Sequence, residues 1–191
     1  MRTHATELIF ILDRSGSMTG MQREVVSGFN EMVSRQKELG DTRVTAVLFN
    51  QETRPLWESL PAEECLLTQT DFRPAGTTAL LDAVGHTLSH TQARIDDLPE
   101  KPQAVVMVIV TDGLENASRE YTHPQVQALI RDRQAAGWEF VFLAANLDAR
   151  AEADRLGICE RDAYHYKATR VRTRQMYRAM DQAITDKRKR T

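Results

Sequence analysis

Oxygen-bearing side chains in three separate segments of the sequence could together hold a metal ion. They are Asp13, Ser15 and Ser17 in the first segment, Thr77 and Thr78 in the second, and Asp112 in the third. All are oxygen donors and none is a histidine or a thiolate, which favours a hard divalent cation such as Mg²⁺ over zinc or copper. Gly16, between the two serines, lets the backbone turn so that both hydroxyls can face one centre.

The charge of this donor set indicates binding rather than catalysis. If only one of Asp13 and Asp112 contacts the ion directly, the ion keeps positive charge and can accept a carboxylate from a partner protein. The three loops contain no histidine, cysteine or lysine that could act as a nucleophile or a general base.

A mainly parallel β-sheet would bring the three segments together. Continuous apolar runs at 8–12 and 104–110 are typical of strands that are covered on both faces. Residues 43–49 and 138–145 predict two further strands. Residues 53–60 contain Pro55 and follow a short turn, so we expect them to form an antiparallel edge strand.

Helical patterns separate these strands. Apolar residues recur at helical spacing from Met21 towards Gly40 and again over 80–88, and a third helix is predicted between Pro124 and Gly137. Two more helices are expected at 148–156 and 171–184.

The alternation of strands and helices predicts an α/β fold. We expect a doubly wound, mainly parallel central sheet of about six strands, with one antiparallel edge strand and helices on both faces. Ligands of such sheets bind beyond the carboxyl ends of the strands, where the three segments would lie. The 191 residues are expected to form a single domain, with a core at about 7–166 and a basic C-terminal helix at about 167–191.

Three motifs resemble elements of von Willebrand factor A (VWA) domains. They are ILDRSGS, GTTALLDAV and VTDG, which correspond in order and approximate spacing to the Asp-x-Ser-x-Ser, Thr and Asp-Gly elements of that family. The resemblance extends over about residues 7–166. The stretch FLAANLDARAEADRLGI (142–158) is most similar to small stand-alone bacterial members.

This resemblance implies a Rossmann-like fold and a metal-ion-dependent adhesion site. The site would bind Mg²⁺, with Mn²⁺ or Ca²⁺ as substitutes, and a Glu or Asp carboxylate of a partner protein would complete the shell. The implied ligands are Asp13, Ser15, Ser17, Asp112 and Thr78, with Thr77 as the alternative threonine. Glu115 and Asn116 would shape the binding surface without being ligands.

Two other function classes remain open from the sequence. One is a Mg²⁺-dependent phosphoryl-transfer or hydrolytic enzyme, but Ser15 stands where an aspartyl-nucleophile enzyme would have its second acid. The other is a nucleic-acid-associated protein that uses the basic C-terminus. Cations also suit the end of a helix, so we favour a solvated helix over a nucleic-acid site there.

The remaining features give no further partner. The net charge of −2 is small, no run is long enough to cross a membrane, and Cys65 and Cys159 are predicted to be free thiols, which together indicate a cytoplasmic protein. His86 and His90 stand four residues apart but on the solvent side of their helix, so we expect no second metal there. Asn146 and Asp148 could contact a partner.

Overall fold

The computed structural model describes residues 5–145, 149–166 and 170–188 of the chain. Its centre is a sheet of six strands in the order β3-β2-β1-β4-β5-β6. The strands are β1 (Thr6–Asp13), β2 (Thr42–Phe49), β3 (Thr53–Pro61), β4 (Ala104–Thr111), β5 (Glu139–Ala145) and β6 (Ala163–Tyr166). All neighbouring strands pair in parallel except β2 and β3, which are antiparallel. The predicted fold class is confirmed.

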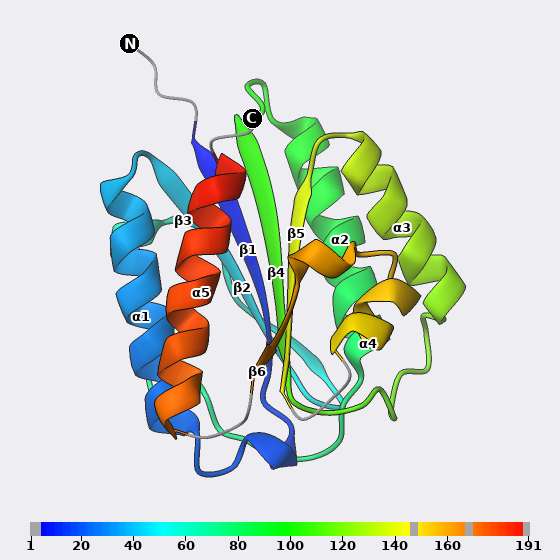
Figure 1. Ribbon diagram of the computed structural model, residues 1–191. Helices are drawn as coiled ribbons and strands as arrows, with labels where there is room; N and C mark the ends of the chain where they lie inside the picture. Colours follow the sequence, from blue (N-terminus) through cyan, green and yellow to red (C-terminus); the bar gives the residue numbers. More distant parts are fainter. Residues whose placement is uncertain (1–4, 146–148, 167–169, 189–191) are drawn as a thin grey trace.

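Helices cover both faces of the sheet (Figure 1). They are α1 (Gln22–Glu38), α2 (Leu80–Asp97), α3 (His123–Ala135), α4 (Ala149–Arg155) and α5 (Arg170–Arg188). Helices α1 and α5 pack together on one face, and α2 and α3 pack together on the other. An apolar core lies on each face of the sheet, and alternate side chains of each central strand point into one core or the other. Phe10 lies on the α1 side against Phe29, and Ile9 lies on the α2 side.

The register of the central strands brings the first and third predicted segments to one edge, and the second segment, which precedes α2, is hydrogen-bonded to the loop after β1. Asp13 at the end of β1 pairs with Phe49 at the end of β2, and Leu12 pairs with Val110 of β4. Asp13 therefore lies level with Thr111, and the loops that follow β1, β2 and β4 all leave the sheet on the same side. We call this edge the rim.

The five strands and five helices that the sequence predicts are present, with boundaries that differ by a few residues, except that α2 runs on to Asp97. The sixth strand, β6, was not located from the sequence because it has only four residues, AYHY. Strand β3 is the antiparallel edge strand, and its pairing with β2 is interrupted by register shifts between Val44 and Val47.

The prediction of a solvated basic C-terminal helix is wrong for its last described turn. Lys187 is only 3% exposed, and its Nζ contacts Glu139 Oε2 at 2.6 Å and Asp162 Oδ1 at 2.8 Å. Arg188 donates from Nη1 to the carbonyl oxygen of Gln36 at 2.8 Å. These two cations therefore hold α5 against the fold, because they pair with groups of β5, of the 3-10 turn Glu160–Asp162 before β6, and of α1.

In the described part of the chain, no helix combines the length and the apolarity needed to span a bilayer. Both cysteines are free, as predicted, with Cys65 buried and Cys159 exposed.

Candidate metal centre

Asp13 is the buried anchor of the rim. It is 1% exposed at the end of the central strand β1. Its Oδ1 accepts the backbone N–H of Ser15 at 2.7 Å, and its Oδ2 accepts the Thr111 hydroxyl at 2.7 Å. These bonds tie the loop after β1 to the end of β4 and fix the direction of the carboxylate.

The two serines and Asp112 form a continuous chain of oxygen atoms beside Asp13. The Oγ atoms of Ser15 and Ser17 lie 3.1 Å apart. Ser17 Oγ donates to Asp112 Oδ1 at 2.6 Å, which joins the first and third segments across 95 positions of sequence. Ser15 and Asp112 are buried and Ser17 is exposed, so the chain leads from the interior to the surface.

The structure brings Thr78, and not Thr77, to this group. A β-carbon built on Gly113 would lie 2.8 Å from Thr78 Oγ1 and 3.7 Å from the Oγ atoms of both Ser15 and Ser17. Three hydroxyls from two loops therefore converge on one small space, which lies on the side of Gly113 where its β-carbon would be; we describe this space as lying above Gly113. Thr77 is exposed, and its backbone N–H donates to Gln51 Oε1 at 3.3 Å.

Asn116 fixes the backbone of Thr78. Its Oδ1 accepts the Thr78 N–H at 3.0 Å, and its own N–H donates to the Thr78 carbonyl at 3.0 Å. Glu115 accepts the Leu81 N–H at the start of α2 at 3.0 Å. Both residues link the loop after β4 to the second segment, and their role at a binding surface stays a prediction.

We call Asp13, Ser15, Ser17, Thr78 and Asp112 the metal group. Asp82 is not part of it and instead helps to join the loop after β4 to α2. Its carboxylate accepts the N–H groups of Arg119, Glu120 and Tyr121 at 2.8–3.0 Å, so it holds the far part of the loop after β4 against α2.

Two positioning residues were missed from the sequence. Thr111 precedes Asp112 and directs Asp13, as described above. Asn50 follows β2, is 4% exposed, and donates from Nδ2 to the carbonyl oxygen of Ala75 at 2.9 Å while its own carbonyl accepts the Ala79 N–H at 2.8 Å. A polar residue directly after a buried strand is the only signal that the sequence carries for either role.

Backbone hydrogen bonds join the first two loops directly. Gly16 donates to the Gly76 carbonyl at 3.0 Å, and Ala75 donates to the Arg14 carbonyl at 2.9 Å. Gly76 has φ +78°, a left-handed conformation that strains any residue with a β-carbon and therefore favours glycine at this position. Main-chain bonds thus join these two loops to each other.

The electrostatics of the rim favour a bound cation. Burial raises the pKa of Asp13, although hydrogen bonds from Thr111 and Ser15 oppose this. Burial also raises the pKa of Asp112, and the nearby charge of Asp13 raises it further. Among the described residues, no cationic side chain contributes to either shift. Two carboxylates therefore share a buried site without a positive partner.

The donor set fits a hard divalent cation. Adjacent oxygen ligands of an octahedral Mg²⁺ lie roughly 3 Å apart, given a metal–oxygen distance of about 2.1 Å. The 3.1 Å between the serine hydroxyls matches this spacing. The space above Gly113 that they share with Thr78 is where such an ion would lie. Hydrogen bonds and short approaches thus gather Asp13, Ser15, Ser17, Thr78 and Asp112 into one group.

The other sequence candidates lie elsewhere. His86 and His90 lie along α2, away from the group around Asp13, and pair with Glu120 at 3.1 Å and Glu58 at 2.6 Å. Within the described ranges, no group of three or more His, Cys, Asp or Glu side chains could hold a metal ion. Any ion at the rim would therefore depend on the hydroxyls. Asn146 and Asp148 lie outside the described residues.

Comparison with known proteins identifies the type of fold. No protein-family model and no curated protein matches the sequence. Many solved structures do match. One is the mussel byssus protein PTMP1 with a zinc-occupied MIDAS motif, which aligns with 95% of this chain at a TM-score of 0.67 and 13% identity. Another is the vWF domain of the type V pilus tip protein Mfa5 from Porphyromonas gingivalis, aligned with 97% of this chain at a TM-score of 0.63 and 11% identity. The chain has the fold of a VWA domain.

A third match is the manganese-loaded TRAP protein of Plasmodium vivax, with a TM-score of 0.66, 16% identity and 95% of this chain covered. The VWA-like chain spans 46% of the mussel protein, 72% of the TRAP chain and 96% of the Mfa5 domain. At these identities the likeness is one of fold. The mussel and Plasmodium structures contain divalent metals, zinc and manganese respectively.

Proposed function

We propose that this VWA-like domain is a metal-dependent protein-binding module. Asp13, Ser15, Ser17, Thr78 and Asp112 would hold a Mg²⁺ ion, for which Mn²⁺ or Ca²⁺ could substitute. A Glu or Asp side chain of a partner protein would bind at the outer face of the ion.

The observation that carries the proposal is the convergence of the three hydroxyls above Gly113, next to two carboxylates that lack a cationic partner. Divalent metals in two structures of the same fold support a metal-binding role. Mg²⁺ prefers oxygen ligands and keeps some of its waters, which a partner carboxylate can replace.

The surroundings of the site suit a protein ligand. Ser17 is exposed, so the metal group reaches the surface. Leu114, directly after the Asp112-Gly113 pair, is 60% exposed and would offer apolar contact area beside the ion. Because the rim loops contain no histidine, lysine or cysteine, the proposed role is binding and not turnover.

The test uses two adjacent threonines as a matched pair. Thr78→Val removes the hydroxyl while preserving side-chain shape, and Thr77→Val does the same to an exposed neighbour. We expect calorimetry to show Mg²⁺ binding by the wild type and by Thr77→Val, and at least roughly tenfold weaker binding by Thr78→Val. Asp13→Ala should abolish binding.

A pull-down from the source cells, with Mg²⁺ and with chelator in parallel, extends the test to the partner. We expect capture by the wild type in Mg²⁺ alone and no capture by Asp13→Ala. Equal Mg²⁺ affinity of the two threonine variants, or partner capture that chelator does not change, would contradict the proposal.

A further inference from the structure

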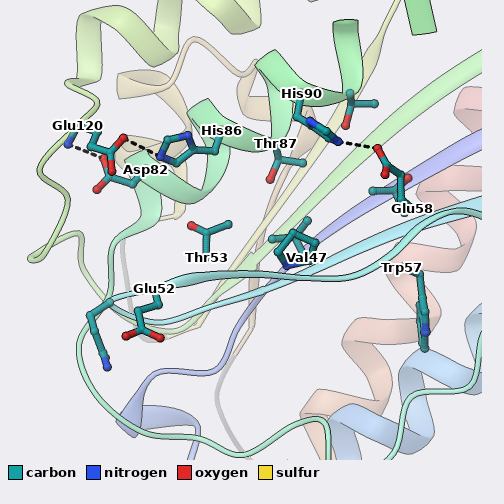
Figure 2. A pocket seen from close by; sticks show the side chains of 14 residues that line it. Val47, Glu52, Thr53, Trp57, Glu58, Asp82, His86, Thr87, His90 and Glu120 are labelled. Carbon is teal, nitrogen blue, oxygen red and sulfur yellow. Dashed lines mark hydrogen bonds and ion pairs between the residues drawn. The ribbon is translucent and has the colours of Figure 1, made fainter. Parts of the chain in front are cut away.

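A groove lies between helix α2 and the β2–β3 hairpin, away from the metal group. Its volume is about 620 Å³, within the usual range of binding sites (Figure 2). It exists because α2 packs on β1 and β2, while the edge strand β3 has no fully buried residue. The side of β3 that faces α2 is therefore left without a covering helix.

The inner surface of the groove is apolar and hydroxyl-rich. Val47 of β2 and Pro55 of β3 lie on the sheet side, and Thr87 faces them from α2. Figure 2 shows Val47 and Thr53 in the middle of the groove, with charged side chains towards both ends.

Carboxylates surround this inner surface. Glu52, Glu58, Asp82 and Glu120 all line the groove, and among the described residues no lysine or arginine lines it. Arg94 reaches one of them, Glu58, from outside the groove at 3.6 Å. His86 and His90 of α2 pair with Glu120 and Glu58, one at each end of the groove in Figure 2. Arg14, which does not line the groove, lies close enough to Glu52 for their charges to interact. The groove therefore favours a cationic ligand.

One end of the groove adjoins the segment of the rim that contains Thr77 and Thr78. Gln51 lines the groove, and the same side chain accepts the N–H of Thr77, the neighbour of Thr78. Asp82 and Glu120 line it as well, and Asp82 holds the loop that follows Asp112. A chain bound at the metal could therefore run into the groove without crossing the body of the domain.

We propose that the groove binds a lysine- or arginine-rich segment of the partner whose carboxylate binds the metal, an inference that rests on the proposed function. Lysine and arginine have apolar stems and charged ends. The stems would lie on the apolar inner surface and the charged ends would meet the surrounding carboxylates. An acidic residue flanked by a basic stretch is thus the ligand pattern that fits the rim and the groove together.

A second hollow beside the rim has the opposite character and serves as an internal control. It has a volume of about 720 Å³ and lies between the start of α1 and the loop before Ala75. Arg23 and Arg73 line it, together with the single acid Glu24. A basic ligand should avoid this second hollow.

The test is a titration of isotope-labelled protein with tetralysine in the presence of chelator, followed by amide chemical shifts. We expect shifts to concentrate at groove residues such as Thr53 and His86, with Arg23 and Arg73 unchanged. Tetraglutamate should not shift the groove residues. The double variant Glu52→Gln/Glu120→Gln should weaken tetralysine binding about tenfold, or roughly threefold for each carboxylate.

The matched control is Glu63→Gln/Glu64→Gln, which removes two exposed acids outside the groove and should leave tetralysine affinity unchanged. Shifts spread evenly over acidic surface residues, an equal loss in the control, or no binding of tetralysine would each overturn the proposal. Mg²⁺ affinity is measured on the same samples. If tetralysine does not bind although Mg²⁺ binds, only the proposal about the groove is refuted. If Mg²⁺ does not bind although tetralysine binds, only the proposal about the metal centre is refuted.

Discussion

Gly113 offers a direct test of where the three hydroxyls point. A β-carbon at this position would lie 2.8 Å from Thr78 Oγ1, closer than van der Waals contact allows, and 3.7 Å from the serine Oγ atoms. The backbone of Gly113 does not adopt positive φ, so alanine can take its conformation. Gly113→Ala should therefore place a methyl group where the ion would lie and turn the Thr78 hydroxyl away, while the fold is preserved.

The magnitudes follow from crowding and from ligand linkage. Extra bulk in a packed site costs about 1–3 kcal/mol, and we expect the lower end because only one short side chain must move. A ligand at 100 times its Kd stabilises the wild type by about 2.7 kcal/mol. For a chain of this length, that corresponds to a rise in Tm of about 5–10 °C. The Tm of Gly113→Ala should rise little or not at all when Mg²⁺ is added.

The assay is thermal unfolding followed by circular dichroism, in Mg²⁺ and in chelator, with calorimetry for affinity. The double variant Gly113→Ala/Thr78→Ala is the control for the clash, because removing Thr78 Oγ1 should recover part of the lost stability without restoring the metal. If Gly113→Ala gained the same Tm as the wild type on addition of Mg²⁺, the ion would not lie at the point where the hydroxyls converge.

Three further predictions concern charge and packing. Because burial raises the pKa of Asp112, the metal-free fold should lose stability as the pH rises above about 4, and Asp112→Asn should reduce this fall. Urea unfolding in chelator at pH 4.5 and 7 measures the loss of stability in the wild type and in Asp112→Asn. An equal loss in the two proteins would contradict the prediction. Gly28→Ala should lower the free energy of unfolding by about 1–3 kcal/mol, because the new β-carbon would lie 2.3 Å from the Tyr177 ring. If urea unfolding gave this variant the stability of the wild type, α1 and α5 would not pack this closely. Lys187→Met should cost about 3 kcal/mol in the same assay, because it removes the buried cation that pairs with Glu139 and Asp162. An unchanged free energy of unfolding would place Lys187 in solvent.

The metal group could be predicted from the sequence because its members are marked locally. Asp13, Ser15 and Ser17 stand at alternate positions where one strand ends, and Asp112 closely follows the apolar run 104–110, which is typical of a central strand. Parallel strands place their ends together, so the meeting of the first and third segments follows from the strand pattern alone. Whether these residues bind a metal stays a prediction.

Other features depend on tertiary contacts that leave no local pattern. Thr77 and Thr78 are identical residue types, and only the packing of the loop shows that Thr78 turns inward. Asn50 bonds to residues 25 to 29 positions away, so its role appears once the loops are assembled. Lys187 belongs to a basic segment, but its acidic partners come from β5 and the turn before β6.

The rim combines fixed geometry with unbalanced charge. Main-chain bonds between Gly16 and Gly76, and side-chain bonds from Asn50 and Asn116, hold the loops in place without a ligand. In the described structure no lysine or arginine offsets the charge of Asp13 and Asp112, so the metal-free fold carries a cost that a cation would remove. Asp112→Asn should therefore gain stability without metal and lose metal affinity together. Such an inverse relation is expected of a ligand site, whereas carboxylates that serve only as turn formers would lose stability when replaced.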